Sequence, residues 1–458
     1  MIRVLQFGEG NFLRAFVDTY FDTLNKEGKG PYEVTVVKPI PYGSLASFEK
    51  QENRYHTVLR GQGEEGSVEE AYKIDVIKRA IDPFTEREAF FALASDENLK
   101  LIVSNTTEAG IVYQETDEKD DFEGMSYPAK LTLFLYERYK NGGKGLTILP
   151  CELIDNNASA LRECVRKYIR KFTLGDDFYR FNEENNIYLN TLVDRIVSGY
   201  PRDERVREHL TSLIGEEDAL MSVCEPFGLW AVERGGDVER YLVEGRHNID
   251  VVLTNDIGYY KKRKVRVLNG AHTGMVPMAL WYGKTFVYDS MKDEKIYRFL
   301  NEMLAEITPF VSEKTADTET FARDVLIRFE NPYLNHALVS ILLNSISKWI
   351  ARNMPSYLDY YAAHATLPER LTAGFAYLIA LYSTAKMRED GSFYATTPYG
   401  EVPLNDTKEY LLHFARGGSV REFLTSGIFP EELISLPSFL STVEDAVTRI
   451  KNGEDLRG

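Results

Sequence analysis

The segment that decides how the fold begins reads Val4-Leu5-Gln6-Phe7-Gly8-Glu9-Gly10-Asn11-Phe12-Leu13-Arg14-Ala15-Phe16. Its apolar start predicts a short buried strand, and the residues beyond Gly10 predict a helix that runs on to Leu24. Gly8 lets the chain turn sharply, and Gly10 lets a pyrophosphate approach the backbone at the positive end of that helix. Leu13 stands where the pattern GxGxxG has its third glycine. The turn alone therefore leaves two interpretations open, a nucleotide site or a plain strand–helix connection.

Two further positions bear on a nucleotide cofactor. A complete GxGxxG pattern occurs at Gly61-Gln62-Gly63-Glu64-Glu65-Gly66, but no helix follows and its glutamates would repel phosphate, so we predict a hairpin loop there. At the end of the second strand, where NAD-binding proteins usually present an acidic residue, the chain has Lys38. This lysine can favour the 2′-phosphate of NADP or simply end a strand in solvent, so both cofactors stay open. The cofactor-binding candidates so far are Phe7, Gly8, Glu9, Gly10, Asn11, Phe12, Leu13, Arg14 and Lys38.

The chain changes character near residue 258. Before it, short runs rich in β-branched residues alternate with helical or loop stretches, which predicts a parallel sheet covered on both faces. These runs are Arg3–Phe7, Glu33–Val37, Lys100–Ser104, Leu146–Leu149, Leu192–Val197 and Asn248–Leu253. We expect an α/β, doubly wound, nucleotide-binding domain over residues 1–258.

After Tyr259, apolar residues recur at helical spacing and no strand-like alternation is evident. The predicted helices are Lys264–Trp281, Asp293–Phe310, Thr318–Phe329, His336–Tyr361, Pro368–Lys386, Lys408–Phe414 and Ser438–Lys451. Gly391–Pro403 is predicted to be a surface loop. We expect an all-α catalytic and substrate-binding domain over residues 259–458, with a ligand in the cleft between the two domains.

Composition excludes several classes of protein. Apolar residues make up 44% and charged residues 27% of the 458 residues, which suits ordinary folded domains. The chain has 54 Lys and Arg residues against 70 Asp and Glu residues, which gives a net charge of −16. This charge argues against general nucleic-acid or anionic-membrane binding. Three scattered cysteines and the spacing of the histidines predict no metal site. The apolar start is too short for a signal peptide, and no apolar stretch is long enough to cross a bilayer, so we expect a cytoplasmic protein.

A second chemical pattern, Lys264, Asn269 and His272, begins the helical half. On an α-helix Asn269 and His272 share a face, and Lys264 lies about 80° round from His272. Such a trio suits reduction of a carbonyl by hydride. The ammonium gives its proton to the oxygen, the amide donates to the developing alkoxide, and the histidine holds a neighbouring hydroxyl or orients the lysine. Spacing alone leaves open the alternative of a solvated basic face with a structural histidine.

Five segments of the chain occur in a fixed order: Phe7–Phe16, Ser104–Gly110, Pro150–Asp155, Leu192–Pro201 and Lys264–His272. Together they resemble the mannitol dehydrogenase family of polyol-specific long-chain dehydrogenases, and the likeness runs from residue 2 to at least Trp349. The resemblance implies a Rossmann-type N-terminal domain, a mostly helical C-terminal domain, no metal, and a catalytic lysine in the pattern K-x4-N-x2-H. That pattern falls on the trio reached above from spacing.

Within this family the chain is most similar to the keto-uronate reductases, which implies reduction of tagaturonate to altronate with NAD(H). The resemblance also implies that Asn105 and Thr106 lie near the nicotinamide ribose and that Asp194 fixes the active-site floor or Lys264. Lys38 departs from the wider family's acidic residue and keeps NADP open. The alternatives are fructuronate reduction, a mannitol-type polyol dehydrogenase and, from another class, a non-catalytic nucleotide-sensing protein.

Two departures from the wider family concern the substrate. Leu153 stands where the family has an asparagine that helps to hold the reacting oxygen, and Ser340 stands where mannitol-type members have an arginine. Losing groups that hold a polyol fits a substrate with a carboxylate at one end. His336 and Lys348 are the candidates for binding that carboxylate, about 120° apart if one continuous helix carries both. A capping histidine and a solvated lysine are the alternative.

Overall fold

The computed structural model describes residues 1–63, 66–106 and 109–458 and forms two compact units, Met1–Ile257 and Gly258–Gly458. Unit 1 is built on a six-stranded sheet in the order β5-β2-β1-β6-β7-β8, in which all neighbours run parallel. The strands are β1 (Ile2–Phe7), β2 (Tyr32–Val37), β5 (Ile77–Ile81), β6 (Leu99–Ser104), β7 (Thr147–Pro150) and β8 (Ile187–Tyr188). This order, which changes direction between β1 and β6, is that of Rossmann folds. The predicted fold class of this half is confirmed.

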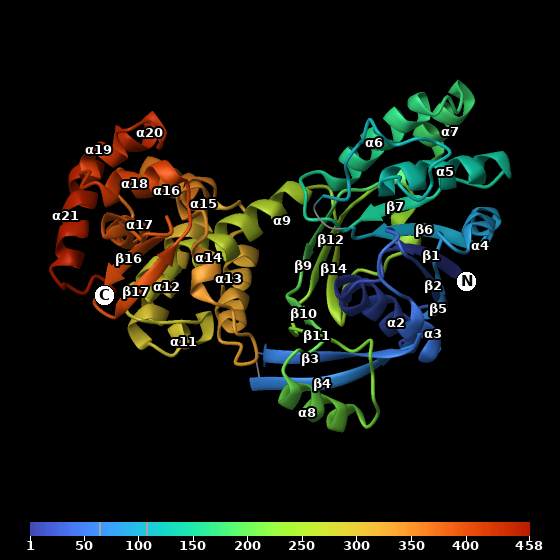
Figure 1. Cartoon of the computed structure of the whole chain (residues 1–458), viewed down its shortest axis with the longest axis horizontal. Helices are drawn as coiled ribbons and strands as arrows, with labels where there is room; N and C mark the ends of the chain where they lie inside the picture. Colours follow the sequence, from blue (N-terminus) through green and yellow to red (C-terminus); the bar gives the residue numbers. More distant parts are fainter. Residues whose placement is uncertain (64–65, 107–108) are drawn as a thin grey trace. The chain divides into compact units, whose positions relative to one another are not determined.

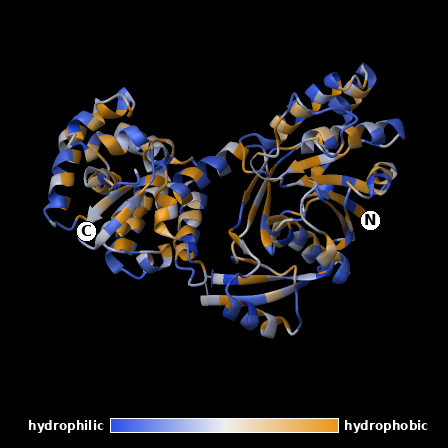
Figure 2. Cartoon of the chain, viewed as in Figure 1, coloured by the Kyte–Doolittle hydropathy of each residue, from blue (hydrophilic) through white to orange (hydrophobic). Residues whose placement is uncertain are grey.

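Helices cover both faces of this sheet (Figure 1). The helices α5 (Tyr127–Lys140), α6 (Asn157–Lys171) and α7 (Asp176–Asn185) lie on one face, and α2 (Thr19–Lys26) lies on the other. In β1, Val4 packs into the α2 side, while Leu5 and Phe7 pack into the α5 and α6 side. Burial on both faces explains why these strands read as continuous apolar runs. Figure 2 colours them largely as hydrophobic.

Two of the six predicted strand runs lie outside this sheet. Leu192–Val197 is divided between β9 (Thr191–Asp194) and β10 (Val197–Gly199), and Asn248–Leu253 is β14 (Ile249–Thr254). β9 and β14 belong to a mixed sheet, in which β12 (Leu229–Glu233) runs parallel to β14 and antiparallel to β9, and β13 (Gly245–His247) lies at one edge. A short apolar run can form a strand of either kind of sheet, so the pattern could not assign its partners.

The second GxGxxG pattern lies between two antiparallel strands. Gly63 ends β3 (Tyr55–Gly63) opposite Gly66, which begins β4 (Gly66–Ile74). The two strands of the predicted hairpin are therefore present, and Glu64 and Glu65 lie outside the described residues. The hairpin belongs to a third sheet with β10 and β11 (Ser222–Cys224).

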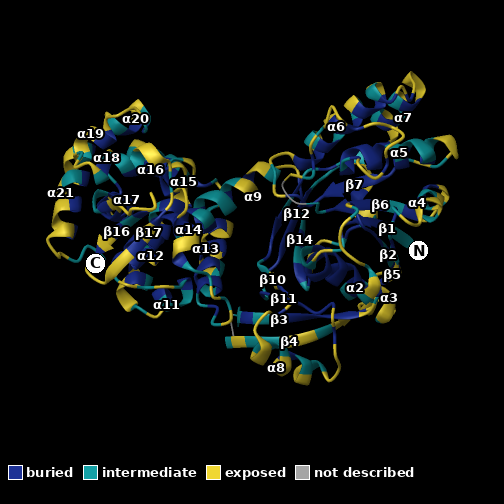
Figure 3. Ribbon diagram, in the orientation of Figure 1, coloured by how far each residue is buried: buried dark blue, intermediate teal, exposed yellow. Residues whose placement is uncertain are grey.

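Unit 2 is mostly helical, as predicted. Its helices include α9 (Ile257–Arg263), α10 (Gly270–Trp281), α11 (Val287–Met291), α12 (Glu294–Ile307), α13 (Thr315–Phe329), α17 (Glu369–Ser383), α18 (Lys408–Ala415) and α21 (Phe439–Lys451). The centre of the unit is α17, buried from Leu371 to Tyr382 and surrounded by α10, α12 and α21 (Figure 3). Among the helices described, none has both the length and the apolar character needed to span a bilayer.

Two predictions for unit 2 were wrong. Gly391–Pro403 is not a loop, because β16 (Phe393–Thr397) and β17 (Gly400–Leu404) pair antiparallel there, beside β15 (Ala385–Met387). The predicted helix His336–Tyr361 is three helices: α14 (Leu338–Leu342), α15 (Ser345–Arg352) and α16 (Met354–His364). It breaks where Asn344 takes a left-handed backbone conformation with φ of 53° and where a proline follows Met354.

Candidate active site

The turn after β1 has the geometry of a phosphate-binding turn. Gly8 has φ of +126°, and its amide donates to the carbonyl of Val37 at 3.0 Å. A Cβ at Gly8 would come 2.9 Å from the carbonyl oxygen of Asn105, so only glycine fits. At Gly10, by contrast, a Cβ would meet no atom within 4 Å. The helix begins at Asn11, and the backbone before it is open where a pyrophosphate is predicted.

Buried polar side chains next to this turn support it through hydrogen bonds. The helix after the turn contains a π-helical segment, Arg14–Asp18, followed by α2. The amide of Gln6 donates to the carbonyl of Gly8 at 3.0 Å and to Oδ2 of Asp18 at 3.2 Å. Asp18 is fully buried, and this burial raises the pKa of its carboxyl to about 7.

The predicted cofactor residues of the turn are placed differently from one another. Phe7, Leu13 and Arg14 are buried, Glu9, Asn11 and Phe12 are half-buried, and Gly10 is exposed. The guanidinium of Arg14 donates to the carbonyl of Leu220 and, at 2.8 Å, to Oδ1 of Asn11. Arg14 therefore braces the turn within the protein. The cofactor contacts of these residues stay predictions.

Lys38 at the end of β2 is not a solvated lysine. It is 3% exposed, and its ammonium pairs with Oδ2 of Asp82 at 2.5 Å and donates to the carbonyl of Gly43 at 3.3 Å. Asp82 directly follows β5, the neighbour of β2 in the sheet. A carboxylate is therefore present where β2 and β5 end, but it follows β5, a strand that the sequence pattern did not predict. Burial also raises the pKa of Glu9, while the charge of Lys38 opposes that shift.

The loop after β6 is tied to the end of β7. The backbone amide of Asn105 donates to Phe7 at 3.1 Å, and its side-chain amide donates to the carbonyl of Cys151 at 2.7 Å. Thr106 donates from its amide and its hydroxyl to Oε1 of Glu152 at 3.0 and 2.9 Å. Glu152 is 2% exposed, and burial raises its pKa. Sequence reasoning missed its role in holding this loop, although its place after a buried strand was a signal.

Asp194 is the last residue of β9 and is 4% exposed. The next residue, Arg195, donates to the carbonyl of Ala15 at 2.8 Å and to Oδ1 of Asn248 at 2.9 Å. The bond to Ala15 fixes the end of β9 against the helix that follows the glycine turn, and the bond to Asn248 ties it to the residue before β14. Leu153, the residue that replaces the family's asparagine, is 58% exposed.

The trio of unit 2 lies on one continuous helical stretch. A π-helical segment, Lys264–Asn269, joins α9 to α10, so the helix begins at Ile257, well before Lys264. In an α-helix five residues turn through about 140°, but the wider i→i+5 turn rotates less per residue. It therefore brings Lys264 closer to the face of Asn269 and His272 than the sequence predicted. Such segments occur frequently at functional sites.

The cations that precede Lys264 have partners elsewhere in unit 2. Arg263 is buried and pairs with Asp317 at 2.6 Å, and Lys262 donates to the carbonyl of Phe310 at 3.3 Å. Lys261 is exposed. The first two contacts hold α9 against α13 and the segment that follows α12.

His272 lies among aromatic and cationic groups. Its ring stacks on Phe329 with centroids 4.0 Å apart and meets His336 edge-on at 5.2 Å. Burial, followed by the nearby positive charges, lowers the pKa of His272 well below its usual value. At neutral pH it is therefore an uncharged imidazole, which can donate one hydrogen bond and accept another. The structure brings His336 to this site, although it precedes α14 and shares no helix with Lys348.

The other carboxylate candidate, Lys348, lies on α15 and donates to the carbonyl of Ile341 at 2.9 Å. Two arginines that sequence reasoning missed, Arg328 and Arg352, also act on His272. Their signal in the sequence was weak, because arginines on helices are usually solvated.

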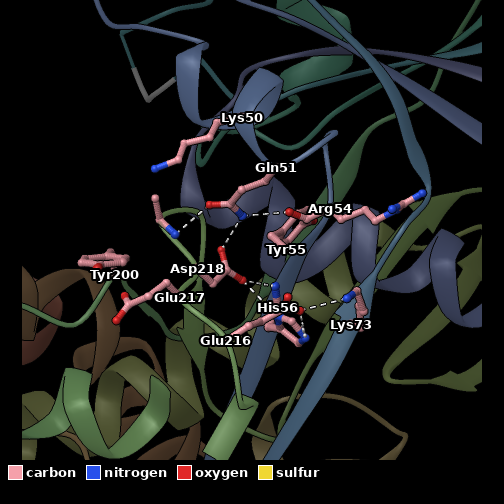
Figure 4. A pocket seen from close by; sticks show the side chains of 11 residues that line it. Lys50, Gln51, Arg54, Tyr55, His56, Lys73, Tyr200, Glu216, Glu217 and Asp218 are labelled. Carbon is pink, nitrogen blue, oxygen red and sulfur yellow. Dashed lines mark hydrogen bonds and ion pairs between the residues drawn. The ribbon is translucent and has the colours of Figure 1, made fainter. Parts of the chain in front are cut away.

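Unit 1 has a separate cavity of about 530 Å³, lined in part by Lys50, Tyr200 and Glu217 (Figure 4). Three nearby contacts join polar groups that line it: Asp218 with His56 at 3.0 Å, Asp218 with Gln51 at 2.8 Å, and Lys73 with Glu216 at 2.9 Å. Because these groups satisfy one another, we interpret the network as structural.

Comparison with known proteins covers both units. Residues 2–241 match the family model described as the mannitol dehydrogenase Rossmann domain, and residues 256–395 match the mannitol dehydrogenase C-terminal domain. The altronate oxidoreductase of Escherichia coli (strain K12) is 41% identical over 386 residues, which cover 83% of this chain and 80% of that protein. The altronate oxidoreductase of Escherichia coli O157:H7 (strain EC4115 / EHEC) gives the same values.

Two solved structures share the fold. D-sorbitol dehydrogenase in its substrate-free form has a TM-score of 0.78 at 19% identity, covering 100% of this chain and 94% of that one. Mannitol 2-dehydrogenase of Pseudomonas fluorescens, in a ternary complex with NAD and D-mannitol, has a TM-score of 0.63 at 19% identity, covering 98% and 92%. With both family models matched in order along the chain, this protein belongs to the mannitol dehydrogenase family.

Proposed function

We propose that this protein is an NAD-dependent oxidoreductase that reduces tagaturonate to altronate. The proposal rests on Lys264, Asn269 and His272 in unit 2 and on the side chains around them. A lysine, an asparagine and an uncharged histidine follow one another along one helical stretch, and a group of cations suited to a carboxylate lies next to the histidine. Identity to altronate oxidoreductases over most of the chain supports the same substrate.

The protein's part in the reaction is to place the substrate carbonyl and to move one proton. Nicotinamide, when bound, supplies the hydride that adds to the carbonyl carbon. The ammonium of Lys264 gives its proton to the carbonyl oxygen, which becomes the hydroxyl of altronate. The amide of Asn269 donates to this oxygen as negative charge develops on it. The uncharged His272 holds a neighbouring hydroxyl. In the reverse direction, neutral Lys264 accepts the hydroxyl proton.

The residues of the glycine turn fit a dinucleotide. Gly8 and Gly10 keep the backbone clear, and the helix that starts at Asn11 directs its free amides to a pyrophosphate. Asn105 and Thr106 are assigned to the nicotinamide ribose, where the contacts to Cys151 and Glu152 keep their loop in place. Asp194 is assigned to the floor of the active site.

Within the nicotinamide cofactors we assign NAD rather than NADP. The charge of Lys38 is already matched by Asp82 inside the protein, so it offers little to a 2′-phosphate. Asp82, and Glu9 to the extent that it is ionised, would repel that phosphate, whereas a carboxylate suits the free hydroxyls of the NAD ribose. The sign of the charge at this edge therefore favours NAD.

The test is a substrate panel. The purified protein is assayed for loss of NADH or NADPH absorbance with tagaturonate, fructuronate and fructose. The proposal predicts the highest kcat/KM with tagaturonate and NADH. A higher value with fructuronate would make the protein a fructuronate reductase, and a higher value with fructose would make it a polyol dehydrogenase. NADH binding without turnover of any compound would favour a nucleotide-sensing protein.

A further inference from the structure

The helix α15 brings two cations to the helix that carries the trio. Lys348 and Arg352 are four residues apart and so share a face of α15. The guanidinium of Arg352 donates from Nη1 to the hydroxyl of Thr273 at 3.1 Å. The next residue, Asn353, donates to the carbonyl of Gly270 at 3.0 Å. These two contacts anchor the end of α15 on α10, on either side of His272 in the sequence.

Positive groups gather around this contact. The groups whose charges act on His272 are Arg328, Arg352, Lys348 and His336, and all are positive or can become so. Neither Arg352 nor Lys348 forms an ion pair with any carboxylate in the part of the chain that the structure describes. Burial lowers the pKa of both, and only the charge of Asp406 acts favourably on Lys348. Half-buried cations that have no ion-pair partner are unfavourable by themselves, and an anion between them relieves that penalty.

We infer that Arg352 binds the carboxylate of the substrate, with Lys348 beside it, and that Arg352 makes the enzyme specific for sugar acids. This inference rests on the proposed function and names the residue that selects its substrate class. With Nη1 held by Thr273, the guanidinium is fixed in place and keeps Nε and Nη2 for a carboxylate, in the forked geometry that suits two parallel bonds. Sequence reasoning had assigned this role to His336 and Lys348.

Spacing along the helix agrees with this assignment. Tagaturonate carries its ketone and its carboxylate near opposite ends of the carbon chain. Asn269, assigned to the ketone oxygen, and Thr273, which holds Arg352, are four residues apart, or about 6 Å along the helix axis. That separation is comparable to the span between the two groups in an extended uronate. One tagaturonate molecule can therefore reach both Asn269 and the guanidinium of Arg352 at Thr273.

The test compares a charged substrate with its uncharged counterpart. Tagatose has a hydroxymethyl group where tagaturonate has the carboxylate. For Arg352→Gln we expect kcat/KM for tagaturonate to fall about 10- to 100-fold, mainly through KM, because charge-assisted hydrogen bonds contribute about 1.5–3 kcal/mol. Inhibition by altronate should weaken by a similar factor, while kcat/KM for tagatose stays within a few-fold. Arg352→Lys should recover part of the loss.

Controls separate this inference from a structural effect and from the proposed function. Arg421→Gln, at an exposed ion pair of unit 2, should change kcat/KM for neither tagaturonate nor tagatose. NADH binding should be the same in all variants. Equal losses with tagaturonate and tagatose would show that Arg352 only positions α10, and undiminished tagaturonate activity would place the carboxylate elsewhere. Either result overturns the inference alone. A wild-type protein inactive on tagaturonate would overturn the proposed function and this inference with it.

Discussion

Replacing Asp18 with asparagine tests how the glycine turn is supported. Asp18 is fully buried, and its carboxyl accepts hydrogen bonds from Gln6 at 3.2 Å and from the hydroxyl of Tyr55 at 3.4 Å. Burial disfavours the ionised form, so the pKa is raised from 3.8 to about 7 in the folded protein. Asparagine has almost the same shape and can accept the same two bonds, but it carries no titratable proton.

The size and sign of the effect follow from the raised pKa. Below about pH 4 the carboxyl is protonated in both the folded and the unfolded chain, so its full contribution to stability is present there. As the pH rises, the unfolded chain releases the proton first, and the folded wild type loses about 1.4 kcal/mol of stability per pH unit until about pH 7. From pH 5 to pH 8 the free energy of unfolding of Asp18→Asn should therefore rise by about 3 kcal/mol relative to the wild type.

The assay must report on unit 1 alone, because a chain of two units need not unfold in one step. Trp230 packs against Phe16, Tyr20 and Phe21, on the helix that contains Asp18 and its continuation. Urea unfolding is followed by tryptophan fluorescence in a background where both tryptophans of unit 2 are phenylalanine. A difference in unfolding free energy that stays constant between pH 5 and pH 8 would refute the reasoning.

Three further predictions concern the cofactor and the reacting carbonyl. Gly8→Ala should lower both the melting temperature and the affinity for NADH, because Gly8 has a positive φ and a carbonyl oxygen would lie 2.9 Å from the added Cβ. Gly10→Ala should weaken only NADH binding. Calorimetry measures the melting temperature and a fluorescence titration measures NADH binding, so together they distinguish the two variants. Asp82→Asn should raise kcat/KM with NADPH relative to NADH, because Lys38 loses its counter-charge; an unchanged ratio would count against the assignment of this pair to the ribose. Asn269→Ala should lower kcat about 10²- to 10³-fold by removing a donor to the developing alkoxide, and steady-state rates with only a few-fold decrease would exclude that role.

Features of the protein that depend on local sequence could be predicted, and those that depend on tertiary pairing could not. The backbone of the glycine turn needs only a strand, two glycines and a helix in order, so residues 4–24 were sufficient to predict it. The hairpin of β16 and β17 was missed, although Phe393, Ala395, Val402 and Leu404 alternate in burial along it, because a short two-stranded segment is stabilised only by what it packs against.

The charged parts of the site show the same limit. Lys38 looked free in the sequence because its partner, Asp82, follows a strand 44 residues later that pairs beside β2. The contact of Arg352 with α10 could not be predicted, because it depends on the break at Asn344, after which α15 ends against α10. No sequence pattern indicated the π-helical segment that begins at Lys264, because its wider turn depends on the packing around it.

The reaction proposed for this protein can be tested by the rate of NADH oxidation by Lys264→Ala at saturating tagaturonate, together with the dissociation constant of this variant for NADH. Loss of the proton donor should lower the rate by about 10²- to 10⁴-fold and leave the dissociation constant unchanged, because unit 1 alone provides the proposed NADH contacts. A variant that oxidises NADH at close to the wild-type rate would contradict the assignment of Lys264, and with it the reaction proposed for this protein.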